Sequence, residues 1–117
     1  MRTISRNSVQ YQGGRFVHNG NVVVDDDLTI EVNNLLVDGD LIVAGDLTAK
    51  NLYVTGKIEV GGDFVAADVA CDHLEIGGNA EIDNIVSQNS TVFIAGDFNV
   101  AGEARTATGG KLEVESL

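Results

Sequence analysis

The 117-residue sequence contains no proline and no tryptophan, and it has one cysteine and one methionine. The lone Cys71 excludes an internal disulfide, which fits a reducing compartment. No stretch approaches the roughly 20 consecutive apolar residues of a membrane-spanning helix, and the first residues lead into no apolar segment of a secretory signal. We therefore expect one soluble, cytoplasmic chain with no membrane insertion.

Basic residues are scarce and unevenly placed. The chain has seven Lys and Arg against 18 Asp and Glu, a formal net charge of −11. Residues 1–20 hold Arg2, Arg6 and Arg15 and no acid, so residues 21–117 combine four basic with 18 acidic residues, a net charge of −14. Such a body repels polyanions, which disfavours direct nucleic-acid binding. The expected partner is a second copy of the chain or a basic protein.

From Val22 onward the sequence repeats a short phrase, in which two apolar residues flank a variable one and a polar corner, often Gly-Asp, follows. Three phrases form one unit. Successive units begin at Leu41, Ile58, Leu74 and Val92, which are 17, 16 and 18 residues apart. Side chains alternate across a strand, so the two apolar residues of each phrase face an interior. This pattern predicts an all-β, single-stranded β-solenoid of about five to six coils with a period of 16 to 19 residues.

Residues 1–20 are predicted to form a basic N-terminal hairpin or arm, and residues 21–117 the acidic solenoid. Gly13 and Gly14 separate two short strand-like segments, and a Gly-Gly pair suits a tight hairpin turn. This pairing places Tyr11 opposite Phe16. A short hairpin is stable only when it docks on something, so it either caps one end of the solenoid or lies along a side.

The same register predicts the interior. Phe64 and Phe98 fall in one column, and Ala80 between them leaves the space that stacked aromatic rings need. Cys71 occupies an inward position equivalent to Val54, where a thiol behaves as a small apolar group. From residue 41 to residue 100 the only clearly polar inward residue is Ser87.

Polar residues recur at the corners. Between first and second strands the equivalent positions are Asp27, Asp46, Asp63, Asn79 and Asp97, and between second and third strands they are Asn34, Asn51, Asp68, Asn84 and Glu103. Stacked carboxylates about 4.8 Å apart could hold cations such as Ca²⁺. The alternative is turn chemistry, because left-handed turn residues favour Gly, Asn and Asp. We expect turn chemistry, with no metal ion and no cofactor.

The outward positions of the third strands are apolar, although outward positions are expected to face solvent. They are Leu36, Tyr53, Ala70 and Val86, and the outward first-strand residues add Val23, Ile42 and Phe93, interrupted by Glu59 and Glu75. An aligned apolar stripe on a surface usually has a cover. Leu36, Tyr53, Val86, Ile42 and Phe93 are therefore predicted to contact protein, either the N-terminal hairpin or another molecule.

No residue set predicts catalysis. His73 lies near Cys71 and Asp72, which invites a metal or nucleophile interpretation, but no further ligand accompanies them. We assign His73 to the corner position of Gly39 and Gly56, since histidine tolerates left-handed backbone. The sequence thus predicts a protein that is not an enzyme.

Two solenoid families resemble the chain. Hexapeptide-repeat acyltransferases share a six-residue phrase, but the 6-5-6 rhythm here differs from theirs, and no catalytic histidine matches. The phrases at residues 39–43, 56–60 and 96–100, Gly-x-apolar-x-apolar, resemble those of bactofilins. That resemblance covers residues 20 to 114 and implies a right-handed single-stranded β-helix that polymerises end to end into cytoskeletal filaments. Phage fibre and adhesin stems use similar phrases.

We therefore expect a self-assembling scaffold that acts through the surface and ends of its solenoid. One alternative is an acidic inhibitor or immunity-type protein that occupies a basic, nucleic-acid-binding site on a target, using a column that includes Asp27, Asp46, Asp63 and Asp97. A phage fibre stem and an acyltransferase are further alternatives.

Overall fold

The structure, a computed structural model, describes residues 2–4, 9–13, 15–88, 91–106 and 113–115. These residues form 17 strands. The strands are β1 (Arg2–Ile4), β2 (Gln10–Gln12), β3 (Arg15–Asn19), β4 (Val22–Val24), β5 (Leu28–Ile30), β6 (Leu35–Asp38), β7 (Leu41–Val43), β8 (Leu47–Thr48), β9 (Asn51–Val54), β10 (Lys57–Val60), β11 (Phe64–Cys71), β12 (His73–Ile76), β13 (Ala80–Ser87), β14 (Thr91–Ile94), β15 (Phe98–Val100), β16 (Ala104–Thr106) and β17 (Glu113–Glu115). The described residues contain no helix that could cross a membrane.

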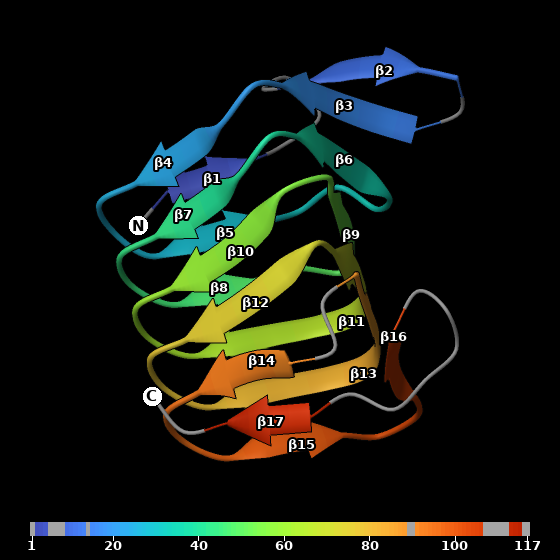
Figure 1. The fold of residues 1–117 in the computed structure, drawn as a ribbon. Coiled ribbons are helices and arrows are strands. Elements are labelled where there is room, and N and C mark those ends of the chain that lie inside the picture. The colour runs from blue at the N-terminus through green and yellow to red at the C-terminus, as the bar shows by residue number, and fades with distance from the viewer. Residues whose placement is uncertain (1, 5–8, 14, 89–90, 107–112, 116–117) are drawn as a thin grey trace.

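The strands stack as the coils of a β-solenoid (Figure 1). First strands form a six-stranded sheet in the order β17-β14-β12-β10-β7-β4, and second and third strands form an eleven-stranded sheet. In this second sheet β11 and β13 each run through both strand positions of a coil. Among the described strands every pairing is parallel except that of β2 with β3. The predicted all-β solenoid is confirmed, with about five coils.

The register between coils follows the predicted repeat. Ile58 pairs with Leu41 on one side and with Leu74 on the other, and all three side chains are fully buried. The outward residue between two buried positions is more exposed, as the burial of β7 shows. Alternation of side chains across each strand therefore separates the core from the surface throughout the stack.

The N-terminal segment extends this stack. β1 pairs in parallel with β5, and β3 pairs in parallel with β6, so both strands belong to the same sheet as the coils that follow. β2 turns back and pairs antiparallel with β3, and Gly13 in the turn has a φ of 59°. Tyr11 lies opposite Phe16 as predicted, with ring centroids 5.0 Å apart in an edge-to-face contact. Phe16 packs against the core, so the hairpin lies at one end of the solenoid.

Interior columns also match the prediction. Ala80 pairs with Phe64 in the coil before it and with Phe98 in the coil after it. Phe64 is fully buried. Ser87 is the buried polar residue of the described core, and its hydroxyl donates a hydrogen bond of 3.1 Å to the backbone oxygen of Asp72. The small side chain between the two rings thus lets coils stack at backbone spacing.

Replacement of Phe64 with Ala should lower the free energy of unfolding by about 3 to 5 kcal/mol, because it removes a fully buried ring and leaves a cavity. Denaturant titration measures this loss. Val65→Ala is the matched control, since Val65 follows in β11 and is 42% exposed. A loss below about 1 kcal/mol for Phe64→Ala would contradict the buried register.

Candidate functional site

The predicted acidic column lies at the corner between the first and second strands. Its members are Asp27, Asp46, Asp63, Asn79 and Asp97. The Oδ1 atom of each of the first four accepts a hydrogen bond of 2.8 Å from the backbone N–H of the next member. The predicted equivalence of these positions is confirmed. The column is a ladder that ties each coil to the next.

A glycine precedes each residue whose backbone N–H donates in this ladder, and the reason is steric. A Cβ atom on Gly62 would collide with Oδ1 of Asp46, and one on Gly78 would collide with Oδ1 of Asp63. Neither glycine has a positive φ, since the described glycines with positive φ are Gly13, Gly20 and Gly39. The expectation that left-handed turns select these corner glycines is therefore wrong. The glycines make room for the side chain of the preceding coil.

The second corner carries a less regular ladder. Asn51 Nδ2 donates to Asn34 Oδ1 at 3.2 Å, and Asn84 Nδ2 donates to Asp68 Oδ1 at 2.8 Å. Here the left-handed explanation holds at one position, because Asn34 has a φ of 58°. Within the described ranges no group of three or more His, Cys, Asp or Glu side chains is placed to hold a metal ion.

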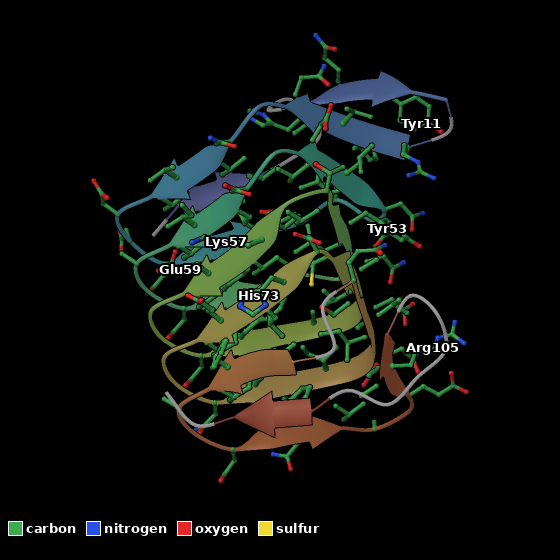
Figure 2. The ribbon with its side chains drawn as sticks, viewed as in Figure 1. Tyr11, Tyr53, Lys57, Glu59, His73 and Arg105 are labelled. Atoms are coloured by element: carbon green, nitrogen blue, oxygen red, sulfur yellow. The ribbon has the colours of Figure 1, made fainter. Side chains whose placement is uncertain are left out.

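The predicted corner position of His73 is wrong. His73 is the first residue of β12 and lies opposite Lys57, so Asp72 is the counterpart of Gly56. Its Nε2 atom lies 3.4 Å from a carboxylate oxygen of Glu75, and its ring makes an edge contact with the ring of Phe93 at 5.5 Å. The histidine therefore belongs to the outer face of the six-stranded sheet (Figure 2).

Cys71 has different surroundings. Its side chain is buried, and burial raises the pKa of the thiol from 9.0 to about 12. A hydrogen bond with Ser87 opposes this rise, and the charge of Asp72 adds to it. The thiol is therefore protonated at neutral pH, which removes the thiolate that nucleophilic or metal-binding chemistry requires.

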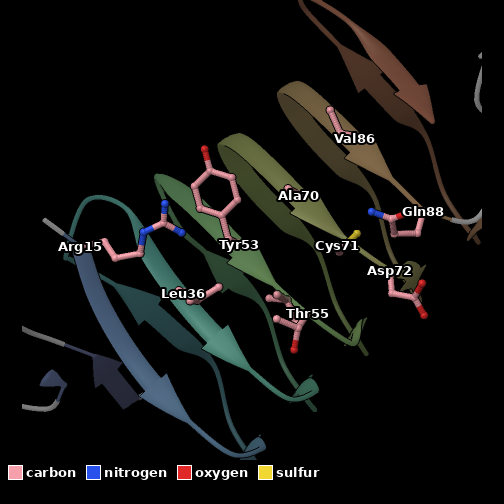
Figure 3. Close-up of a pocket in the computed structure, with 10 residues that line it drawn as sticks. Arg15, Leu36, Tyr53, Thr55, Ala70, Cys71, Asp72, Val86 and Gln88 are labelled. Carbon is pink, nitrogen blue, oxygen red and sulfur yellow. The ribbon is translucent and has the colours of Figure 1, made fainter. Parts of the chain in front are cut away.

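Three predicted contact residues form a groove on the outer face of the third strands. Tyr53 pairs with Leu36 and Ala70, and Ala70 pairs with Val86, so the four side chains lie in one row across neighbouring coils. Tyr53 is 40% exposed, and the other three are half-buried. The row lines an open groove of about 230 Å³ (Figure 3).

One end and one rim of this groove are polar. Arg15 extends from β3 over Tyr53, and its guanidinium carbon lies 5.5 Å from the ring centroid. That distance suits a cation–π interaction. Thr55, Asp72 and Gln88 line the rim on the side where the third strands end. A shallow apolar groove with a cation at one end is suited to binding a surface or a chain, because it does not enclose a small substrate.

The other two predicted contact residues lie elsewhere. Ile42 and Phe93 are in one outward column of the six-stranded sheet, but Glu59 and Glu75 separate them. Glu59 also forms an ion pair of 3.3 Å with Lys57. The structure therefore brings together Leu36, Tyr53 and Val86, without Ile42 and Phe93. The sequence pattern does not predict Arg15 as a groove residue. Val17 pairs with Leu36 of the outward row, and Arg15, two residues before Val17 in β3, lies on the same face.

Comparison of the chain with protein-family models, with curated proteins and with solved structures gives no match. The assignment to bactofilins therefore stays a prediction, whereas the β-solenoid itself is established by the strand pairing.

A double-mutant cycle tests the corner ladder. Gly62→Ala should destabilise the fold by about 1 to 3 kcal/mol, because the new Cβ collides with Asp46 Oδ1. Asp46→Ala removes that atom, so the double variant should be more stable than the sum of the single losses predicts, by about 0.5 kcal/mol or more. Gly61→Ala is the control, since its Cβ meets the backbone oxygen of Ala44. Additive losses at positions 46 and 62 would contradict the steric explanation.

The Cys71 thiol predicts a loss of stability in alkali. Above pH 9 the unfolded thiol loses its proton, whereas the folded thiol with a pKa of about 12 keeps it. Ionisation then stabilises the unfolded state, and the free energy of unfolding should fall by up to about 1.4 kcal/mol per pH unit. Denaturant titrations at pH 8 to 10.5 should show this slope relative to Cys71→Val, which copies Val54. Equal slopes in the two proteins would show that the thiol is not buried.

Proposed function

We propose that this protein is a non-enzymatic scaffold that self-assembles, and that the apolar groove of the third strands is the contact between copies. The observation that carries the proposal is the row of Leu36, Tyr53, Ala70 and Val86, aligned by backbone pairing and left open. The predicted alternative, in which the N-terminal hairpin covers this row, has little support, because Arg15 is the only one of the described hairpin residues that lines the groove.

Charge supports a second copy as the occupant. The outward row continues from Val86 to Arg105, whose side chain is 54% exposed and lies 3.5 Å from Glu103. Arginines therefore stand at both ends of the apolar row, Arg15 at one and Arg105 at the other. A second copy carries 18 acidic residues, so surface carboxylates can pair locally with these two cations, and this attraction opposes the repulsion between two chains of net charge −11. Tyrosine and arginine are also the residue types that contribute most at interface centres.

The hairpin favours association through the side of the solenoid. The edge of β3 would otherwise accept a further parallel strand, but β2 already occupies it in the antiparallel direction. Stacking of whole solenoids is obstructed at this strand. The resemblance to bactofilins supports self-assembly in general, and the contact that we propose is a lateral one.

Tyr53→Glu should lower the oligomeric state, because it removes the aromatic ring from the centre of the proposed contact and places there a carboxylate that neutralises Arg15. Its core stability should stay near that of wild type, since Tyr53 points outward and is 40% exposed. Sedimentation velocity over a range of concentrations measures the effect, and circular dichroism checks the fold.

Val65→Glu is the matched control for this experiment. Val65 is 42% exposed and lies outside the groove, on the second-strand part of β11. The control should assemble as wild type does. A wild-type chain that stays monomeric at high concentration would reject self-assembly and favour the acidic-inhibitor alternative, and equal effects of the two variants would reject the groove as the contact.

A further inference from the structure

The six-stranded sheet ends at β4, and no described residue pairs with the outer edge of that strand. The N–H of Val22 donates to Asp40 O, and the carbonyl of Val24 accepts from Ala44 N, so both groups bond toward β7. Backbone groups of successive strand residues point to opposite edges. The N–H and C=O of Val23 therefore point to the open edge.

The neighbouring strand positions at this end are filled. β1 lies on β5 as a second strand, and β3 lies on β6 as a third strand. These two strands belong to a coil that precedes the one containing β4. Among the described residues the first-strand position of this coil is empty, so two filled positions flank one vacant strand position.

A hollow of about 300 Å³ marks this vacant position. Apolar residues from four segments line it, and they are Ile4, Val9, Val22, Val23, Val24 and Leu28. Val22 is half-buried at the end of the inward column that continues with the fully buried Leu41. Thr3, His18 and Asn21 supply the polar part of the lining. An incoming strand would find both an unpaired backbone edge and an apolar floor for its inward side chains.

We propose that this end of the solenoid is a peptide-binding site that takes one extended strand of a partner protein, parallel to β4. The strand bonds to the N–H and C=O of Val23 and places apolar side chains at alternate positions over Val22 and Val24. This is strand addition to a sheet edge, in which backbone bonds provide affinity and side-chain pockets provide selectivity.

Charge at the corner defines the partner further. In the parallel direction the C-terminal end of the added strand lies beside the residues that follow β4. These residues are Asp25, Asp26 and Asp27, and all three are exposed. Basic residues directly after the apolar positions therefore complement the site. The partner segment has the form apolar, any, apolar, basic, basic.

A single strand fits better than the end of a second solenoid. A stacked coil would need the edge of β3 as well as that of β4, and β2 occupies the edge of β3. The site and the groove share β3, which places His18 at one and Arg15 at the other, but no described residue lines both. The peptide site therefore does not depend on the proposed self-assembly.

The test uses the full chain and the acetylated, amidated peptide Gly-Val-Thr-Val-Lys-Lys, titrated by NMR. Wild type should bind it, and binding should protect the Val23 amide from hydrogen exchange. Val23→Pro removes the N–H that points to the open edge, while its exposed side chain carries no core packing, so binding should weaken at least about tenfold. Val23→Thr keeps the N–H and should bind as wild type does.

Further measurements distinguish the backbone contribution to peptide binding from the contribution of charge, and they distinguish peptide binding from the proposed self-assembly. A peptide ending in Glu-Glu should bind more weakly than the Lys-Lys peptide, and Asp25→Asn should reduce that difference. Tyr53→Glu should bind the peptide normally, and Val23→Pro should keep the oligomeric state of wild type. Circular dichroism checks the fold of Val23→Pro. If Val23→Pro unfolds, the effect of Asp25→Asn on peptide binding still tests the proposal. Equal binding by Val23→Pro and Val23→Thr, or no protection of the Val23 amide, would overturn the proposal.

Discussion

Parallel backbone pairing between coils, at a spacing of about 4.8 Å, is the constraint on which the rest of the structure depends. It sets each residue directly against its counterpart one coil away, so every position must fit both neighbours. Ala80 between Phe64 and Phe98 shows this in the core, where two rings share the space above and below a methyl group. Gly62 and Asp46 show it at the corner, where the carboxylate of Asp46 occupies the space that a Cβ atom at position 62 would need.

The sequence predicts the coils well because two independent periods agree. Alternation within a strand assigns the inward face, and the recurrence every 16 to 19 residues assigns the coil-to-coil register. Together they predicted the core column of Phe64, the burial of Ser87 and the equivalence of Asp46 with Asp63. The same agreement predicts that Leu36, Tyr53 and Val86 lie in one outward row, as the strand pairing shows.

Where the period changes, prediction fails. The coil from Ile58 to Leu74 has 16 residues, so counting 17 from Gly56 placed His73 one position too early, on a corner rather than in β12. The N-terminal segment shares no phrase with the coils, and its place on β5 and β6 could not be predicted from the repeat. The steric role of the corner glycines could not be predicted either, because the sequence shows each Gly-Asp pair but not the carboxylate of the preceding coil that lies against the glycine.

The two proposed contacts differ in what the solenoid leaves unsatisfied. In the groove the backbone is fully engaged by neighbouring coils, and only apolar side chains such as Tyr53 remain available, so a partner must present a complementary surface. At β4 the backbone of Val23 remains available, so a partner must present a strand. β2 separates these outcomes, because it closes the edge of β3, which a stacked coil would need, whereas the edge of β4 is open among the described residues. On these two proposals, whole solenoids would associate through the side, where apolar side chains are available, and a single strand would bind at the end, where the edge of β4 is open.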